Sequence, residues 1–224
     1  RNKEEPRKMK DSGVEWIGKI PEEWETCKVK NVYSNPKEIV GNRVDLFERL
    51  ALTLKGVLKR PKEDAEGLQP ERFEGYQILR ENQLVFKLID LENVRTSRVG
   101  LSPYTGLVSP AYIVLDNSMT SKFGYYFFLS MWHREIFNQL GGDGVRSSIG
   151  PKDLLNLPYL LIDNEEQQAI ANYLDSKVSL IDDIIEKTKQ SIEDYKKYKQ
   201  SLITETVTKG LNPDVEMKDS GIEW

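Results

Sequence analysis

Residues 164–209 read NEEQQAIANYLDSKVSLIDDIIEKTKQSIEDYKKYKQSLITETVTK, and this stretch decides the architecture. Apolar or near-apolar side chains recur in it at alternating steps of four and three, which is the spacing of a coiled-coil seam. The seam runs through Ile170, Leu174, Val178, Ile181, Ile185, Thr188, Ile192, Tyr195 and Leu202, and Lys199 is the charged residue that interrupts it. We therefore predict a long helix that dimerises through Leu174, Val178, Ile181, Ile185, Ile192, Tyr195 and Leu202.

Both ends of this helix carry recognisable signals. Asn164 with Gln167 three positions later resembles a capping box, and the two glutamates between them favour the positive end of the helix dipole. Gly210, followed closely by a proline, stops the pattern. Such a helix spans roughly 70 Å at 1.5 Å per residue, which is more than a domain of this size needs for its own core. We expect residues 163–209 to pair with another helix, from a partner chain or from a second repeat.

A repeat marks the two ends of the sequence. The octapeptide Met9–Trp16 (MKDSGVEW) recurs as Met217–Trp224 (MKDSGIEW), 208 residues later and with one conservative change. We interpret residues 1–16 as an N-terminal repeat segment and residues 210–224 as the start of a second repeat, so that the chain is half of a duplicated protein. Chance or an added sequence is the alternative, although seven identities in eight positions, including a tryptophan, argue against it.

The segment between the repeat and the helix, residues 17–158, has the pattern of a mixed α+β domain. Short apolar runs separated by Gly, Pro, Asn and Asp predict strands at Arg49–Leu54, Gln83–Leu88 and Leu107–Leu115. Aromatic residues at helical spacing predict a helix between Ser121 and Leu140, ended by the glycines from Gly141. The predicted fold class is α+β, a globular domain followed by a long helix that forms a coiled coil.

Composition excludes several classes of protein. One cysteine and one histidine among 224 residues cannot form an internal disulfide or a Cys/His zinc site. The sequence has no uncharged apolar run of about 20 residues and no secretory signal pattern, so we expect a cytoplasmic protein with no membrane association. Residues 17–158 are nearly neutral and residues 159–224 are acidic. The overall net charge of −4 argues against non-specific coating of nucleic acid.

Several motifs, taken in order, resemble one known family. They are DSGVEWIG (11–18), IPEEWE (20–25), GLVSPAY (106–112), Gly144-Val145-Arg146 and EEQQAI (165–170). This ordered set, with the 208-residue repeat, is similar to the specificity subunit of type I restriction–modification enzymes, in a half-length form with one target-recognition domain. Family members carry two such domains, each followed by a long helix, and the helices pair antiparallel. The family's usual Leu-Pro-Pro-Leu before the helix is Leu157-Pro158-Tyr159-Leu160 here.

The resemblance implies that the chain reads double-stranded DNA and that its partners perform the chemistry. Residues 17–158 would then be the target-recognition domain, which reads one half of a bipartite site. Methyltransferase subunits would dock on acidic faces, and the restriction subunit would join through them. S-adenosylmethionine, ATP and Mg²⁺ would be bound by those partners only, and this chain would be a non-catalytic subunit with no cofactor of its own. Because the unpaired seam is apolar, we expect a homodimer and hence an inverted-repeat target.

Three loops offer side chains suited to DNA. Long cations suit phosphates or guanine edges, hydroxyls can donate or accept, and glycines allow close approach of the backbone. The candidates are Lys55, Lys59, Arg60 and Lys62 in the first loop, Arg95, Thr96, Ser97, Arg98 and Tyr104 in and after the second, and Gly144, Arg146 and Ser147 in the third. The alternatives are solvated surface charge for the first two loops and a plain helix end for the third.

Two motifs resemble catalytic sites, but neither is accompanied by the other residues that such a site needs. Asn156-Leu157-Pro158-Tyr159 is one substitution from the Asn-Pro-Pro-Tyr loop of adenine methyltransferases, but no glycine-rich strand-to-helix turn precedes it to hold the methyl donor. Acidic residues 63–66 beside Lys62 are better explained as a solvated loop than as a nuclease site. The rival to DNA recognition is a coiled-coil protein-interaction module without sequence-specific DNA binding.

Overall fold

The computed structural model describes residues 7–61, 72–91, 98–117, 121–141, 148–212, 214 and 216–222. It divides into two compact units, Arg1–Asn172 and Tyr173–Trp224, and the division falls inside the long helix. Each unit is considered by itself. The first is a mixed α+β domain, and the second consists of most of the long helix with the segment after it.

Two packed sheets form the centre of the first unit. One has the strand order β5-β4-β9-β6, and the other has the order β10-β7-β8. All pairs are antiparallel except β4 with β9. The bounds are β4 (Arg49–Thr53), β5 (Gly56–Arg60), β6 (Gln77–Leu79), β7 (Leu84–Phe86), β8 (Val99–Leu101), β9 (Gly106–Val108) and β10 (Ile113–Leu115).

Alternation along β7 explains how the layers stack. Val85 packs into a cluster with Leu52 and Val57 of the four-stranded sheet, whereas Leu84 and Phe86 point to the opposite side and meet the helices. Gly100 of β8 pairs with Val85, and a Cβ atom there would lie 2.6 Å from a Leu52 methyl carbon. Only glycine therefore lets the two sheets approach this closely.

Helices and a second pair of strands cover the other face of the three-stranded sheet. Tyr159 is fully buried among the aromatic side chains of the first helix, and its hydroxyl lies 3.3 Å from that of Tyr33. The elements are α1 (Ser121–His133), α2 (Ile136–Leu140), α3 (Pro151–Asn156), β3 (Glu25–Lys28), which pairs with β11 (Pro158–Leu161), and the 3₁₀ turn η1 (Val29–Asn31). A second 3₁₀ segment, η2 (Gly41–Leu46), packs instead against Ile78 and Leu107 of the four-stranded sheet.

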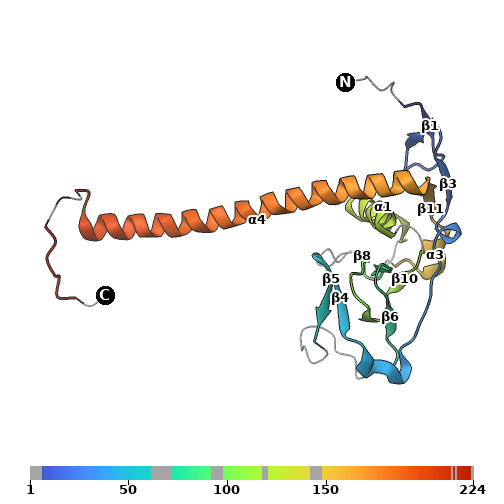
Figure 1. Ribbon diagram of the computed structural model, residues 1–224, viewed down its shortest axis with the longest axis horizontal. Coiled ribbons are helices and arrows are strands. Elements are labelled where there is room, and N and C mark those ends of the chain that lie inside the picture. The colour runs from blue at the N-terminus through green and yellow to red at the C-terminus, as the bar shows by residue number, and fades with distance from the viewer. Residues whose placement is uncertain are drawn as a thin grey trace. The chain divides into compact units, whose positions relative to one another are not determined.

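The long helix α4 (Asn164–Lys209) has the bounds that its sequence predicts, and Figure 1 shows it as one uninterrupted helix. Its N-cap differs from the prediction by one residue. The Asp163 carboxylate, not the Asn164 side chain, accepts the Glu166 backbone N–H at 2.9 Å. Gly210 follows the helix with φ +78°, the left-handed conformation that favours glycine after a C-terminus. The α+β fold class with a long C-terminal helix is confirmed.

Two predicted elements are each broken in the structure. Residues 107–115 form two strands, β9 and β10, because Gln77 donates its side-chain amide to the carbonyls of Ser109 and Tyr112 and holds a turn between them. The predicted helix 121–140 is two helices separated at Glu135, whose φ is +56°. His133 is exposed at the end of α1.

The two copies of the octapeptide fold alike locally. In the first copy the Asp11 carboxylate accepts the backbone N–H of Gly13 at 2.8 Å, and in the second Asp219 accepts that of Gly221 at 2.9 Å. The two glycines have φ +73° and +72°. Only the first copy forms a strand, β1 (Met9–Asp11), which pairs with β2 (Lys19–Pro21). The turn is therefore encoded locally, whereas the strand requires its partner.

The first turn of α4 is tied to the N-terminal segment. The Glu166 carboxylate accepts hydrogen bonds from Trp24 Nε1 at 2.8 Å and from the Arg7 guanidinium, which also pairs with Glu23. These contacts, chiefly the hydrogen bond from Arg7, lower the pKa of Glu166. The EEQQAI motif thus fastens the helix to the domain as well as starting it.

Replacing Glu166 with glutamine should lower the stability of the first unit at neutral pH, because the ionised carboxylate is the form that Arg7 and Trp24 stabilise. A carboxyl whose folded-state pKa is depressed contributes stability above its unfolded pKa of about 4.3, and this contribution disappears as pH falls through the folded value. Urea unfolding followed by circular dichroism at pH 7 and at about pH 3 should show the deficit shrinking with acid. Glu165→Gln, one residue away and exposed, is the matched control. An equal deficit in both variants would contradict the assignment.

Candidate nucleic-acid interface

The β4–β5 hairpin carries three of the predicted DNA-contacting residues. Strands β4 and β5 run side by side, as Figure 1 shows, and are joined by a two-residue turn that contains Lys55. Lys59 and Arg60 lie on β5, at the edge of the four-stranded sheet. Lys55 and Lys59 are exposed and Arg60 is half-buried, so the hairpin presents a basic edge to solvent.

The structure brings Lys59 together with Tyr104, which the sequence places 45 positions away. The ammonium of Lys59 lies 5.2 Å from the centre of the Tyr104 ring. Tyr104 is held by Ser102, whose buried hydroxyl donates to the Tyr104 carbonyl at 2.7 Å and accepts its N–H. Residues from two of the predicted loops therefore lie on one surface. A cation such as Lys59 can bind phosphate, and an aromatic ring such as that of Tyr104 can stack on a base.

Glu48, which no pattern in the sequence marks as a site residue, pairs with Lys59. The carboxylate lies 2.5 Å from Lys59 Nζ, and the hydrogen bond it accepts raises the pKa of Lys59. Register explains the contact, since Lys59 lies opposite Leu50 and Glu48 is two residues further along the same face. Recognising this pair from the sequence would have required the register of the β4–β5 hairpin, whereas residues 55–62 were expected to form a loop. A phosphate that binds Lys59 has to compete with this carboxylate.

The prediction that Arg98 contacts DNA is wrong. Its side chain is 1% exposed and its guanidinium donates inward, to the backbone carbonyls of Ile89 at 3.1 Å and Asp90 at 2.6 Å, and more weakly to that of Lys87. Burial lowers the pKa of Arg98 while the nearby Asp90 charge opposes that shift. Arg98 is thus a clamp that closes the turn after β7, and it cannot reach a ligand.

The remaining predicted contacts lie outside the described residues. These are Lys62, Arg95, Thr96, Ser97, Gly144, Arg146 and Ser147. They stay predictions. The acidic cluster at residues 63–66 lies outside the described residues as well.

The structure supplies a physical reason to reject the methyltransferase-like tetrapeptide. Tyr159 of that motif is fully buried in the aromatic core, where burial raises its pKa, and its hydroxyl lies 3.3 Å from that of Tyr33. Asn156 donates to the Lys152 carbonyl at the end of α3. A catalytic loop of this kind has to present its aromatic ring to a flipped base, and this ring is inside the core.

A hollow of about 300 Å³ lies between the Ser109–Tyr112 turn and the start of α3. Lys37 and Asn35 stand on its wall, with Ile89, Ile113 and Ile149. The Asn35 amide donates to the Val114 carbonyl at 2.6 Å, and the Gln77 amide is already used to hold the turn. The side-chain amides of Asn35 and Gln77 therefore support the fold.

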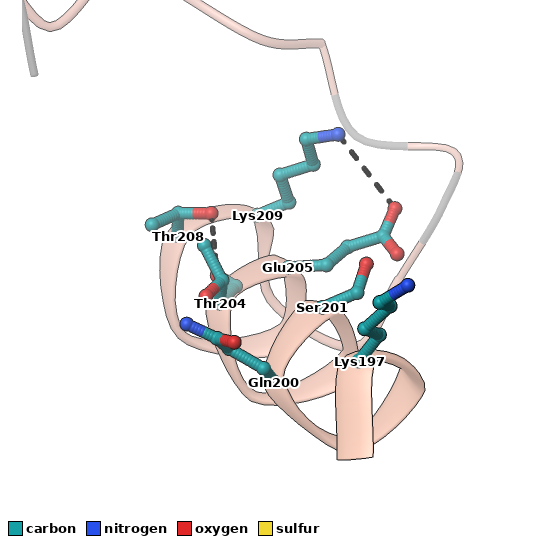
Figure 2. A pocket seen from close by; sticks show the side chains of 7 residues that line it. All are labelled: Lys197, Gln200, Ser201, Thr204, Glu205, Thr208 and Lys209. Atoms are coloured by element: carbon teal, nitrogen blue, oxygen red, sulfur yellow. Dashed lines mark hydrogen bonds and ion pairs between the residues drawn. The ribbon is translucent and has the colours of Figure 1, made fainter. Parts of the chain in front are cut away.

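Figure 2 shows a shallow depression at the C-terminal end of α4, in the second unit. All of its lining side chains come from one helix, and Lys209 and Glu205 form an ion pair across it at 3.6 Å. Thr208 donates its hydroxyl to the Thr204 carbonyl one turn back. Such a surface has neither the enclosure nor the convergent groups of a catalytic site.

The described part of the chain contains neither a metal-binding cluster nor a membrane-spanning helix. Within these residues no three side chains of the His, Cys, Asp or Glu type are grouped so that they could hold a metal ion. Within the same residues no helix combines the length and apolar character that crossing a bilayer requires.

The dimerisation residues predicted from the sequence lie along α4 in the second unit. Ile181 and Ile192 are about half exposed, at 55% and 50%, and Tyr195 is 73% exposed. Leu174 is half-buried. A second apolar strip, which includes Tyr173, Leu180, Ile184 and Tyr198, is exposed beside the seam. An isolated copy thus presents a broad apolar surface along the helix, and pairing of the seam stays a prediction.

The structure therefore defines a class of protein. It has a mixed α+β domain that carries a basic hairpin, and the domain is followed by a long helix with an exposed apolar face. Solved structures that are similar to this chain include proteins of type I restriction–modification systems. The chain is similar to the HsdS subunit from Thermoanaerobacter tengcongensis (15% identity, TM-score 0.51, 91% of this chain and 48% of that one). It is also similar to a protein whose structure describes complex assembly and conformational transition of the type I R-M system. That match has 13% identity and a TM-score of 0.52, over 89% of this chain and 52% of that one.

The S subunit from M. genitalium is a further match, at 17% identity and a TM-score of 0.46, over 83% of this chain and 46% of that one. No protein-family model and no curated protein matches the sequence. The chain spans about half the length of the solved subunits that it matches. It has the fold of a type I restriction–modification specificity subunit.

Proposed function

We propose that this chain is the DNA sequence-specificity subunit of a type I restriction–modification system. The observation that carries the proposal is the shared fold, an α+β domain followed by the helix Asn164–Lys209. The similarity extends over about nine tenths of this chain. The exposed cations of the β4–β5 hairpin supply the charge that phosphate binding needs. The chain is non-catalytic in this proposal and acts in the cytoplasm.

When two copies pair through α4, the resulting homodimer has two DNA-binding domains. The seam residues are apolar and largely exposed in one copy, and each aliphatic side chain that becomes buried contributes about 1.5–3 kcal/mol. Two-fold symmetry then requires identical half-sites on opposite strands. Each domain reads one half of the target, and the helix pair sets the gap between the halves.

Adenine methyltransferase subunits are the partners that perform the chemistry. They bring S-adenosylmethionine, and through them a restriction subunit brings the ATP- and Mg²⁺-dependent steps. The acidic character of residues 159–224 and the apolar strip beside the seam are the surfaces offered for their docking. Most of these acidic residues and all of the strip lie on the helix, away from the basic hairpin along the sequence.

Co-expression with the cognate methyltransferase, followed by single-molecule sequencing of cellular DNA, tests the proposal. The expected result is an interrupted inverted repeat with a methylated adenine in each half. A methylated motif with two unrelated halves would refute the homodimer but keep the recognition function. No enriched sequence, both in cells and in gel shifts of the complex on randomised duplexes, would favour the rival, a protein-interaction module.

Inserting four residues into the middle of α4 should lengthen the gap between the half-sites by one or two base pairs. Four residues add one turn and roughly 6 Å, and each base pair occupies about 3.4 Å. The same sequencing experiment reads the gap directly, and the half-site bases should stay unchanged. Altered bases at a fixed gap would show that the helix does not act as a spacer.

A further inference from the structure

The tip of the β4–β5 hairpin carries an exposed leucine that the basic surface alone does not explain. Thr53 pairs with Gly56 as the last pair of the ladder, so Leu54 and Lys55 form the turn beyond it. The Leu54 side chain is 61% exposed. Leu58, opposite Ala51 on the outward face of the hairpin, is 40% exposed. The hairpin therefore presents apolar side chains among its cations.

Local bonds hold this tip in one conformation. The Thr53 hydroxyl donates to the Gly56 carbonyl at 2.9 Å and accepts the Lys55 N–H at 3.1 Å. Gly56 has φ +95°, which a residue with a side chain adopts only with strain. Behind the tip, Leu52 and Val57 are buried against the neighbouring sheet. Leu54 is thus presented on a rigid support, as a recognition side chain has to be.

The dimensions and charge of the hairpin fit the major groove of duplex DNA. A two-stranded ribbon can enter that groove, which is about 12 Å wide, but not the minor groove, which is about 6 Å wide. Lys55 lies next to Leu54, and Lys59 and Arg60 follow on β5, so the hairpin offers cations to the phosphates that border the groove. This arrangement fits duplex DNA, which is anionic along its backbone and displays an apolar methyl group in its major groove.

We propose that Leu54 contacts the C5-methyl group of a thymine in the major groove and so specifies an A·T pair in each half-site. A leucine side chain has no donor or acceptor, and the thymine methyl is the apolar group that base pairs display in that groove. The inference rests on the proposed DNA-recognition function and adds a specificity-determining residue to it. Lys55 and Arg60 position the hairpin by binding phosphates, and Leu54 recognises the base pair.

The test has two parts, both with the complete complex of this chain and its methyltransferase. First, the methylated motif is determined for the wild type, for Leu54→Ala and for Leu46→Ala, a control leucine that is 74% exposed at the end of η2. Leu54→Ala should relax the preference at one A·T position per half-site, and Leu46→Ala should leave the motif unchanged. Circular dichroism checks that both variants are folded.

Second, binding is measured on duplexes in which each thymine of the motif is replaced in turn by deoxyuridine, which removes only the methyl group. At one position the wild type should lose about fourfold in affinity, the value of one buried methyl group, and Leu54→Ala should show no loss there.

Three outcomes overturn the inference and leave the proposed function standing. They are an unchanged motif in Leu54→Ala, equal binding of all deoxyuridine duplexes by the wild type, and a uniform loss of affinity on every sequence together with loss of DNA bending. The last would mean that the leucine acts as a wedge between base steps. Failure of the wild-type complex to enrich any motif would instead remove the proposed function, and the inference with it.

Discussion

Replacing Arg98 with alanine should destabilise the first unit by about 3–5 kcal/mol and leave no base-specific defect to measure. The substitution removes a side chain that is 1% exposed and leaves the carbonyls of Ile89 and Asp90 without their guanidinium donor. Each buried polar group that loses its partner costs about 1–3 kcal/mol, and the cavity adds to that. Urea unfolding followed by tryptophan fluorescence measures the loss, because Trp16, Trp24 and Trp132 all lie in this unit.

Two other cations separate this structural role from DNA contact. Arg134 is exposed beyond the end of α1, and its replacement by alanine should change the free energy of unfolding by less than about 0.5 kcal/mol. Lys55→Ala should keep the stability but weaken binding to all duplexes and reduce the salt dependence by about one unit. A stable Arg98→Ala variant with altered base preference would show that the clamp is misassigned.

The part of the fold that the sequence predicted most accurately is the part with the most local signals. Helix α4 begins at Asn164 and ends at Lys209 as predicted, since heptad spacing, N-terminal acids and Gly210 are all read from neighbours in the chain. The N-cap was off by one because Asp163 and Asn164 are both good capping residues. The turn of the octapeptide repeat is another local feature, and it forms in both copies.

Elements that depend on distant contacts were predicted less well. Residues 107–115 are rich in strand-forming residues, and what divides them is the amide of Gln77, about thirty positions earlier. The break at Glu135 has no glycine or proline to announce it, and the left-handed conformation there is held by the packing of Ile136 and Phe137 in the core. Tertiary contacts, not local propensity, decide both cases.

The candidate interface shows the same division. The hairpin cations could be identified because charge in a predicted turn after a strong strand is visible in the sequence. The pairing of Lys59 with Glu48 and Tyr104 required the register of β4 and the position of a separate loop. Arg98 was misassigned because a basic residue in a polar loop looks like surface charge, and nothing in the sequence indicates that three carbonyls face it from inside the turn.

A charge placed in the middle of the α4 seam should abolish pairing of the helix. Ile185 lies near the midpoint of α4 and is 44% exposed in one copy, so in an antiparallel dimer two copies of it meet close to the two-fold axis. Ile185→Glu removes about 1.5–3 kcal/mol of apolar burial from each copy and brings two like charges together. We expect the dissociation constant to rise by about 100- to 10,000-fold, measured by sedimentation equilibrium.

Ser179→Glu is the matched control, because it adds the same charge to the same helix on a face away from both the seam and the second apolar strip, where the side chain is exposed. It should leave the dimer intact, and both variants should keep their helical circular dichroism if a single copy is stable. The consequence for function follows from the symmetry. Without pairing, Ile185→Glu carries one recognition domain per complex, so methylation of the two-part target should fall with the dimer while Ser179→Glu methylates normally. A monomeric wild type, or an Ile185→Glu variant that dimerises as tightly as the wild type, would show that the seam pairs with a different helix.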